Sequence, residues 1–195
     1  MTDRPTRPRI EPAQEWPPEL ADRIQSERRG TALNVTKTIA RHPELFRRFG
    51  PFGGYLAFGG LLDGRSREIV ILRVGWRARA VYEFGQHTLY GRQAGVSDDE
   101  IRALTGEPSD WPGTAEERDL IAMVDELCDD DCVTEATWAR LAARWSEAEL
   151  VELLILAGFY RLISGFLNSV GVHAEDDTVP GWPDGVDPEP VADGR

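Results

Sequence analysis

Apolar residues in the middle of the chain recur every three or four positions, the spacing of one face of an α-helix. Three segments also carry a hydroxyl residue followed three positions later by a carboxylate, the capping box that begins a helix. These pairs are Ser97 with Glu100, Thr114 with Glu117 and Ser146 with Glu149. The pattern therefore predicts that helices begin at 98, near 115 and at 147.

Three further residues are typical of helix ends. Asn34 suits the N-cap of a helix, Pro43 the first turn of the next helix, and Gly95 a left-handed stop. The expected helices cover residues 35–40, 44–58, 65–79, 82–94, 98–104, 116–128, 135–144 and 147–172. Val70, Ile71 and Leu72 favour a strand locally, but they lie between good helix formers without turn residues. We therefore expect an all-α fold.

Prolines are dense at both ends of the chain. Five of the first 20 residues and four of the last 22 are proline, which opposes regular structure. We expect a Pro-rich N-terminal tail over 1–19, one helical domain over 20–173, and an acidic Pro-rich tail over 174–195. The last tail carries seven acidic residues against one arginine. Its simplest role is solubility, and the alternative is a disordered arm that covers a partner.

The longest weakly charged stretch is 151–172, and Arg161 interrupts it. The uncharged runs on either side are shorter than a membrane span, so we expect a buried helix and no membrane association. Its apolar residues form more than one stripe: Leu153, Leu154, Leu156, Phe159, Leu162, Ile163, Phe166, Leu167 and Val170. Such a surface needs a neighbour, so we expect a homo-oligomer, first of all a trimer, with a dimer or hexamer as alternatives.

The net charge of −12 disfavours nucleic acid as a partner, because nucleic-acid-binding surfaces concentrate Lys and Arg. No apolar segment precedes the first prolines, so we expect no secretory signal and a cytoplasmic protein. Two cysteines are too few for a disulfide scaffold and agree with a reducing compartment.

Histidine is scarce, and one of the three copies stands out. His42 precedes Pro43 at a helix junction and His173 follows the last long helix, where structural roles are sufficient. His87 lies four residues after Glu83, so both side chains project from one helix face. A carboxylate beside an imidazole raises its pKa and fixes its tautomer, as proton transfer requires. The same spacing is also common in purely structural helix pairs.

Other chemistries have little support in the sequence. Three aspartates separate Cys128 from Cys132, and neighbouring carboxylates raise a thiol pKa, so these cysteines are poor nucleophiles. The chain has no H-E-x-x-H motif and no complete calcium loop, and we expect no metal. It also has no G-x-G-x-x-G, no Walker lysine and no G-x-S-x-G, which disfavours nucleotide binding and serine hydrolysis.

The segments SREIVILRVGW, at 66–76, and YEFGQH, at 82–87, resemble the carboxymuconolactone decarboxylase family, which includes the alkylhydroperoxidase D-like proteins. The resemblance spans 34–95 and continues through DLIAMVDELCDD, TWARLAARW and ELLILAGFYRLISGFLNSVGV. It implies an all-helical fold, trimers or higher oligomers, and a site on the helix that carries the motif histidine.

In the peroxidase branch of that family, a glutamate is followed about twelve residues later by C-x-x-C and then by a histidine. On this sequence the same spacing falls on Glu68, Ala80, Glu83 and His87, so both thiols are missing. The resemblance then implies the decarboxylase side of the family, which acts without metal or organic cofactor, with Glu68, Glu83 and His87 as acid/base groups.

These observations predict a cofactor-independent enzyme acting on a small organic acid, lactone or natural-product intermediate. The candidate reactions are decarboxylation, lactone opening and isomerisation through an enolate. Arg73 is a candidate partner for a substrate carboxylate, and Trp76, Tyr82 and Tyr55 are candidate walls of an apolar pocket. The alternatives are a redox protein that uses Cys128 and Cys132, and a non-catalytic helical oligomer that binds a small molecule.

Overall fold

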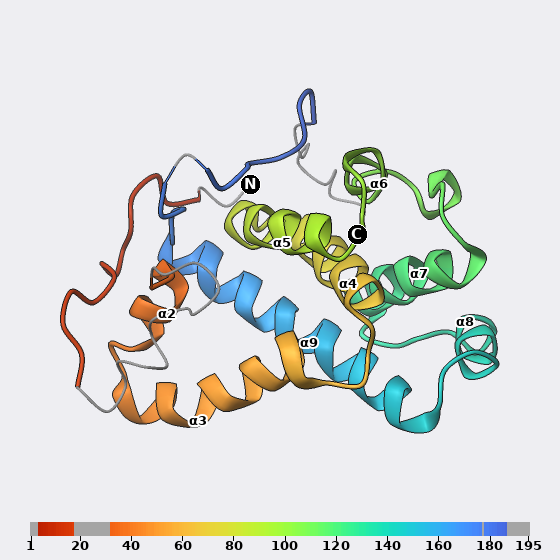
Figure 1. Cartoon of the computed structure of the whole chain (residues 1–195), viewed down its shortest axis with the longest axis horizontal. Helices are drawn as coiled ribbons and strands as arrows, with labels where there is room; N and C mark the ends of the chain where they lie inside the picture. The colour runs from red at the N-terminus through yellow and green to blue at the C-terminus, as the bar shows by residue number, and fades with distance from the viewer. Residues whose placement is uncertain (1–3, 18–31, 177, 187–195) are drawn as a thin grey trace.

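The computed structural model describes residues 4–17, 32–176 and 178–186, and Figure 1 shows their arrangement. The α-helices are α2 (Asn34–Ile39), α3 (Pro43–Gly54), α4 (Gly64–Arg77), α5 (Val81–Gln93), α6 (Asp98–Ala103), α7 (Ala115–Asp130), α8 (Glu135–Ala142) and α9 (Glu147–Val170). A π-helical turn, η2 (Tyr55–Gly59), continues α3, and a 3-10 turn, η3 (Pro108–Asp110), precedes α7. The described residues form no strand, so the prediction of an all-α fold is confirmed.

Helix α4 is the centre of the molecule, because it packs against α5, α7 and α9. Residues Ile69, Val70, Ile71 and Leu72 are all fully buried, so α4 is covered on several sides. Burial on several sides explains why the segment lacks a clear amphipathic stripe, and why Val70, Ile71 and Leu72 locally favour a buried strand in the sequence. The long-range packing around α4 holds it in place, and α5 lies directly on it.

Most of the predicted helix starts are confirmed by hydrogen bonds. Ser97, Thr114 and Ser146 each accept from the backbone amide three residues later, while the paired glutamate bonds back to the cap. His42 caps α3 by accepting from the Leu45 amide at 3.2 Å, with Pro43 in the first turn. Gly95 has a φ of 84°, the left-handed conformation that ends a helix.

The predicted capping role of Asn34 is wrong. Leu33 is the N-cap residue of α2 and makes no side-chain cap, while Asn34 is the first helical residue. The Asn34 side chain instead donates to the backbone carbonyl of His173 at 3.0 Å. The Asn34 side chain therefore bonds a residue far away in the sequence and does not cap α2. The local sequence pattern does not reveal such a contact.

The predicted helix over 44–58 is also interrupted. Its α-helical part ends at Gly54, and Tyr55–Gly59 forms a π-helical turn before the chain bends at Gly60. The buried carboxylate of Glu152, from α9, accepts hydrogen bonds from the backbone amides of Leu61 (2.8 Å) and Leu62 (3.2 Å). This contact fixes the bend and directs the chain from α3 into α4.

The described parts of both predicted tails pack on the helical body. The Arg9 amide donates to the carbonyl of Val170 at 2.7 Å, and Trp182 packs edge-on to Trp76 with ring centroids 5.3 Å apart. The expected boundary between residues 19 and 20 lies outside the described residues. Residues 4–17 and 178–186 therefore contribute to the folded surface, although their sequence is rich in proline.

Helix α9 is long and apolar enough, by length and composition, to span a membrane. Half of its most apolar stretch is buried inside the protein, however, and the helix packs against α4 and α5. These contacts fit the expected role of a core helix.

Candidate active site

Helices α4 and α5 form a hairpin that brings Glu68 and His87 together. The connection between them is short, so α5 runs back along α4 and the first half of α4 faces the middle of α5. The Nδ1 atom of His87 lies 2.6 Å from Oε2 of Glu68. One turn earlier on α5, Glu83 places Oε1 at 3.1 Å from Nε2 of His87. Both ring nitrogens of His87 therefore face a carboxylate.

These three side chains are almost completely shielded from bulk solvent. Glu68 is 1% exposed, Glu83 5% and His87 6%. Burial by itself lowers the pKa of His87, but the charges and hydrogen bonds of Glu68 and Glu83 outweigh it and raise the pKa from 6.5 to about 9. At neutral pH the ring is therefore an imidazolium, a proton donor. Two carboxylates therefore act on the ring, where the sequence pattern alone indicated one.

Arg67 contributes a further charge beside the site. Its Nε lies 3.3 Å from Oε1 of Glu68, on the side of the carboxylate away from His87. Glu68 therefore bonds a cation through each oxygen, which fixes its orientation. The arrangement holds the His87 ring in one orientation, with Nε2 directed toward Glu83.

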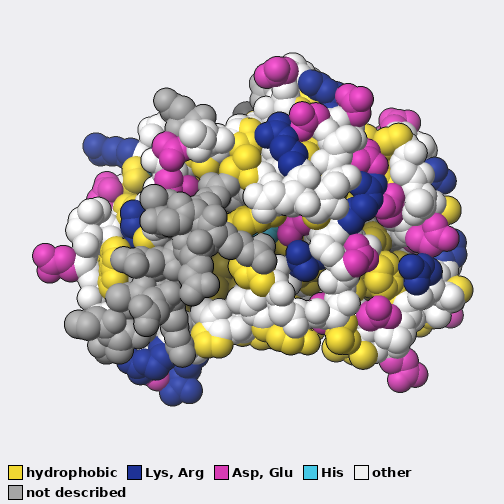
Figure 2. Space-filling view, viewed as in Figure 1, with side chains coloured by type: hydrophobic (Ala, Val, Ile, Leu, Met, Phe, Trp, Pro, Cys, Tyr) yellow, Lys and Arg dark blue, Asp and Glu magenta, His cyan; other side chains and the backbone are white. Residues whose placement is uncertain are grey.

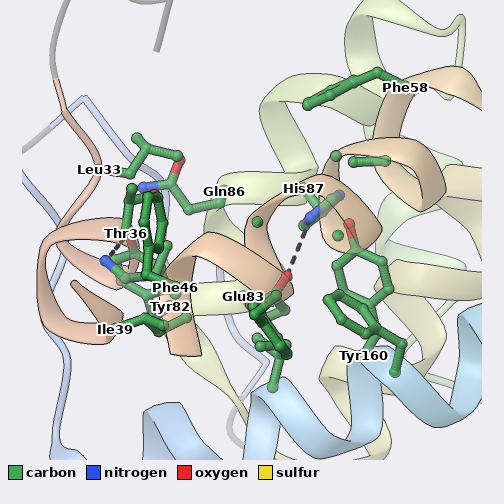
Figure 3. A pocket seen from close by; sticks show the side chains of 18 of the residues that line it. Leu33, Thr36, Ile39, Phe46, Phe58, Tyr82, Glu83, Gln86, His87 and Tyr160 are labelled. Atoms are coloured by element: carbon green, nitrogen blue, oxygen red, sulfur yellow. Dashed lines mark hydrogen bonds and ion pairs between the residues drawn. The ribbon is translucent and has the colours of Figure 1, made fainter. Parts of the chain in front are cut away.

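A pocket of about 610 Å³ opens over this cluster (Figure 3). Glu83 and His87 line it, whereas Glu68 lies behind His87 and is not part of the lining. The walls come mainly from α2, α3 and α5, with α9 closing one side. The aromatic lining residues are Phe46, Phe49, Phe58, Tyr82, Tyr90, Phe159 and Tyr160. The site thus combines a carboxyl–imidazole pair with a largely apolar wall, as small-molecule sites commonly do.

Tyr160, from α9, lies next to the catalytic candidates. Its ring packs edge-on against the His87 ring with centroids 5.0 Å apart. Burial, and then the negative charges of Glu83 and Glu68, raise the pKa of its hydroxyl well above the usual value. The hydroxyl therefore stays protonated and can donate a hydrogen bond. Figure 3 shows it directed to the same part of the pocket as His87.

Of the four predicted substrate contacts, only Tyr82 lines the pocket. Tyr55 does not line it, is 48% exposed, and directs its hydroxyl to Glu152 at 3.5 Å. Trp76 does not line the pocket either, and its ring packs with Trp182. The structure therefore does not bring Tyr55 or Trp76 to this pocket. Helix spacing does not reveal which face of α4 lies near the pocket, and it does not reveal the π-helical turn that carries Tyr55.

The predicted role of Arg73 as a carboxylate-binding residue is corrected by its contacts. Its guanidinium forms a two-pronged ion pair with Asp125, at 2.7 and 2.6 Å. The remaining nitrogen donates to the backbone carbonyls of Leu104 and Gly106, both at 2.7 Å. Arg73 is buried and outside the pocket, and it ties α4 to α7 and the chain after α6.

Neither cysteine takes part in the site. Cys128 is half-buried in the last turn of α7, where burial raises its thiol pKa, and Cys132 is exposed. They are the only two cysteines of the chain, so no thiol lines the pocket. Over the ranges that the structure describes, no group of three His, Cys, Asp or Glu side chains is arranged to hold a metal ion.

Several lining residues were not predicted from the sequence. Tyr160, Phe159 and Phe49 belong to apolar stretches that predict only burial, and Gln86 lies within YEFGQH without being assigned a role. Gln86 does lie one residue before His87 and four after Tyr82, so the α5 periodicity contains a weak signal for its face.

The family model for the carboxymuconolactone decarboxylase family matches residues 43–126, which contain Glu68, Glu83 and His87. Among curated proteins, none matches the chain. Solved structures show the same fold at low sequence identity. A peroxidase-related protein from Silicibacter sp. TM1040 has a TM-score of 0.79 and 17% identity, covering 93% of this chain and 99% of that chain.

Two more structures are similar over most of their length. A peroxidase-related protein with an alkylhydroperoxidase core, from Ralstonia eutropha JMP134, has a TM-score of 0.77 and 20% identity, covering 87% of this chain and 94% of that one. A debrominase in complex with 2,3,4-tribromopyrrole has a TM-score of 0.76 and 14% identity, covering 90% and 96%. Residues 43–126 therefore match the carboxymuconolactone decarboxylase family, and the chain shares the fold of the alkylhydroperoxidase D-like structures.

Proposed function

We propose that this protein is an acid/base enzyme that moves a proton on a small, mainly apolar substrate without a cofactor. The observation that carries the proposal is the hydrogen-bonded series Glu68, His87, Glu83 at one side of an aromatic pocket. Proton transfer needs a carboxylate and a proton donor that both reach the substrate, and Glu83 and His87 line the pocket together. Glu68 acts behind them as the positioning residue.

The roles follow from charge and position. The Glu83 carboxylate accepts a proton from the carbon next to a substrate carbonyl, and the electrons of the C–H bond form an enolate. The imidazolium of His87 and the hydroxyl of Tyr160 stabilise the negative charge that develops on the oxygen. Return of the proton at another carbon completes an isomerisation. Decarboxylation of a β-keto-type acid releases CO₂ and also leaves an enolate, while lactone opening by attack of water gives a tetrahedral oxyanion. All three reactions place negative charge on an oxygen that the same donors can stabilise, so all three remain within the proposal.

The pocket walls restrict the substrate. Aromatic rings dominate the lining, and the described residues that line it include no Lys or Arg. A substrate with several carboxylates would find no cationic partner among them, so we propose a compact molecule with one polar reacting end. The debrominase of similar fold binds a small halogenated aromatic ring, and a pocket of this character could hold a ring of that size.

Hydrogen–deuterium exchange into substrate tests the proposal even when the final product is unidentified. A panel of small β-keto acids, unsaturated lactones and aromatic ketones is incubated with the enzyme in D₂O and followed by ¹H NMR. Enolate chemistry predicts exchange or turnover of at least one member. Glu83→Gln and His87→Ala should each lower the rate by roughly 10² or more.

The matched control is Glu135→Gln, at an exposed position in the first turn of α8, which should retain the wild-type rate. Full activity of both site variants would remove the assignment. Binding of a panel member without exchange, unchanged in the two variants, would instead favour the non-catalytic binding protein.

A redox function is the second candidate, because two of the similar structures are peroxidase-related proteins. It would have to use Cys128 and Cys132, which lie outside the pocket. We expect the double variant Cys128→Ser, Cys132→Ser to keep its deuterium-exchange activity. Peroxide reduction by the wild type that disappears in this variant would establish the redox function instead.

A further inference from the structure

The C-terminal segment brings one carboxylate, that of Glu175, between two walls of the pocket. Oε1 of Glu175 accepts hydrogen bonds from the Tyr82 hydroxyl (2.7 Å) and from the backbone amide of Asn34 (2.6 Å). Its other oxygen, Oε2, accepts from Nε2 of Gln86. We call these four residues, Asn34, Tyr82, Gln86 and Glu175, the Glu175 cluster. Its members come from α2, from α5 and from the segment after α9.

The Glu175 cluster connects parts of the pocket that are separate in sequence. Tyr82 and Gln86 line the pocket from α5, the helix that also carries Glu83 and His87. The Tyr82 hydroxyl additionally accepts from the Val35 amide at 3.2 Å, so it bonds α2 directly. Leu33, Val35, Thr36 and Ile39, at and before α2, form the facing wall. Glu175 and Tyr82 thus hold the α2 wall against the catalytic helix.

Three contacts downstream keep the segment in place across α5. The carbonyl oxygen of Pro180 lies where a side chain at Gly85 would be, only 2.0 Å from an ideal Cβ. Trp182 packs on Phe84 with ring centroids 4.9 Å apart. The Arg102 guanidinium donates to the backbone carbonyl of Asp184 at 2.6 Å. Only glycine at 85 allows this close approach, so the sequence of α5 is adapted to the segment that crosses it.

The orientation of the Gln86 amide indicates that Glu175 fixes the position of a side chain in the pocket wall. A carboxylate only accepts hydrogen bonds, so the amide nitrogen of Gln86 must face it. The opposite atom, Oε1, is then buried without a partner among the described residues. Leaving a buried acceptor unpaired is unfavourable, so the charged bond to Glu175 imposes this orientation on a residue of the pocket wall.

We propose that Glu175 is a positioning residue that holds α2 against α5 and thereby sets the width and the affinity of the pocket. This inference rests on the proposed function only in taking the pocket as the substrate site. Without the carboxylate, the Asn34 amide and the Tyr82 hydroxyl lose their common partner, the bond from the Val35 amide to Tyr82 is what remains of these contacts, and the wall formed by α2 loosens from α5. Glu83 and His87 keep their own bonds to each other, so the reacting groups stay in place.

The test compares Glu175→Gln and Glu175→Ala with Asp184→Asn, an acidic position of the same segment whose bond to Arg102 uses only its backbone. Amide hydrogen exchange followed by NMR reports on α2 directly. We expect Asn34 and Val35 to exchange at least tenfold faster in Glu175→Ala and less so in Glu175→Gln, which keeps one acceptor oxygen. Amides of α4 should exchange at the wild-type rate in all three variants.

Binding of a neutral apolar fluorescent probe, N-phenyl-1-naphthylamine, gives a second measurement that does not depend on catalysis. The dissociation constant should change several-fold in Glu175→Ala and remain at the wild-type value in Asp184→Asn. Where a substrate is known from deuterium exchange, Glu175→Ala should change KM by roughly tenfold, with kcat within about threefold.

Wild-type exchange at Asn34 and Val35 together with unchanged probe binding in Glu175→Ala would overturn the proposal. Faster exchange throughout α4 and α5 would also overturn it, because Glu175 would then only stabilise the fold. If Glu83→Gln has no effect on turnover while Glu175→Ala still opens α2, the proposed function fails and the positioning role stands. The two inferences are therefore tested separately.

Discussion

The charge of His87 depends on which residues surround its two ring nitrogens. One carboxylate at i−4, Glu83, was visible in the sequence, but the closer one, Glu68, belongs to the preceding helix. Only the family spacing indicated Glu68, because nothing in the local pattern joins positions 19 residues apart. The second carboxylate changes the chemistry, since it raises the pKa of His87 to about 9 and keeps the ring protonated at neutral pH.

This charge state predicts how stability depends on pH. The pKa of His87 in the folded protein, about 9, lies above its ordinary value of 6.5, so protonation stabilises the fold. That contribution, on the order of 3 kcal/mol, is fully present below pH 6.5 and is lost as the pH rises through 9. We expect the difference in unfolding free energy between wild type and His87→Gln to fall across this interval in urea titrations. His173→Gln, an exposed histidine outside the site, is the control, and an equal fall in both variants would contradict the prediction.

Arg73 stabilises the fold through a buried ion pair and two backbone contacts. It is 3% exposed, and its fork geometry serves Asp125 and two backbone carbonyls, which a lysine cannot reproduce. Breaking a buried ion pair leaves an uncompensated charge, so Arg73→Ala should lower the unfolding free energy by about 3 to 5 kcal/mol. Arg73→Lys should recover only part of this loss.

The control for Arg73 is Arg92→Ala, which removes an ion pair to Asp98 that is largely exposed. It should cost about 1 kcal/mol or less. Equal losses in Arg73→Ala and Arg92→Ala, measured by urea unfolding, would make Arg73 a candidate binding residue again.

At the scale of helices, the sequence was most informative where the signal is local. A capping box involves residues three apart, so Ser97, Thr114 and Ser146 marked their helices correctly. The end of α3 was missed because the bend after Gly60 depends on Glu152, which lies on α9 about 90 residues further along the chain. The Asn34 contact with His173 was missed for the same reason. Contacts between distant segments form only when the helices pack, and no window of sequence contains them.

The bend after η2 gives a prediction about the junction of α3, α4 and α9. A methyl group at Gly60 would lie 2.0 Å from Oε1 of Glu152, so Gly60→Ala must displace a carboxylate that bonds two backbone amides. We expect Gly60→Ala to lower the unfolding free energy by about 2 to 3 kcal/mol. The loss should be much smaller when Gly60→Ala is introduced into Glu152→Ala, since the clash is then absent. Additive losses in this double-mutant cycle would show that the two residues do not interact.

Across the molecule as a whole, the described end segments pack on the helices, whereas two of the outer helices keep exposed apolar side chains. Residues 4–17 and 178–186 cover parts of α5 and α9 through contacts such as those of Arg9 and Trp182. The outer face of α9 and the end of α3 remain uncovered by the described residues, and Figure 2 shows hydrophobic side chains along the lower edge of this face. The exposed apolar residues of α9 are Val151, Ile155 and Leu162, and those at the end of α3 and in the turn after it are Phe52, Tyr55 and Leu61.

This apolar surface is the basis for proposing a homo-oligomer, with a trimer as the expected form. Contiguous exposed apolar area is unusual on soluble monomers, and closed symmetry lets identical copies bury the same patch.

Leu162 is 60% exposed on α9, whereas Phe166 packs inside the chain against the cluster around Tyr82 and Ile163. A charge at Phe166 would damage the fold itself, so Leu162→Glu is the cleaner change. We expect it to dissociate the oligomer in sedimentation equilibrium at micromolar concentration while the helical circular dichroism is retained. Ala139→Glu, at an exposed neutral position on α8, adds the same single negative charge and is the control. A wild-type protein that sediments as a monomer at that concentration would contradict the assembly and leave the pocket complete within one chain.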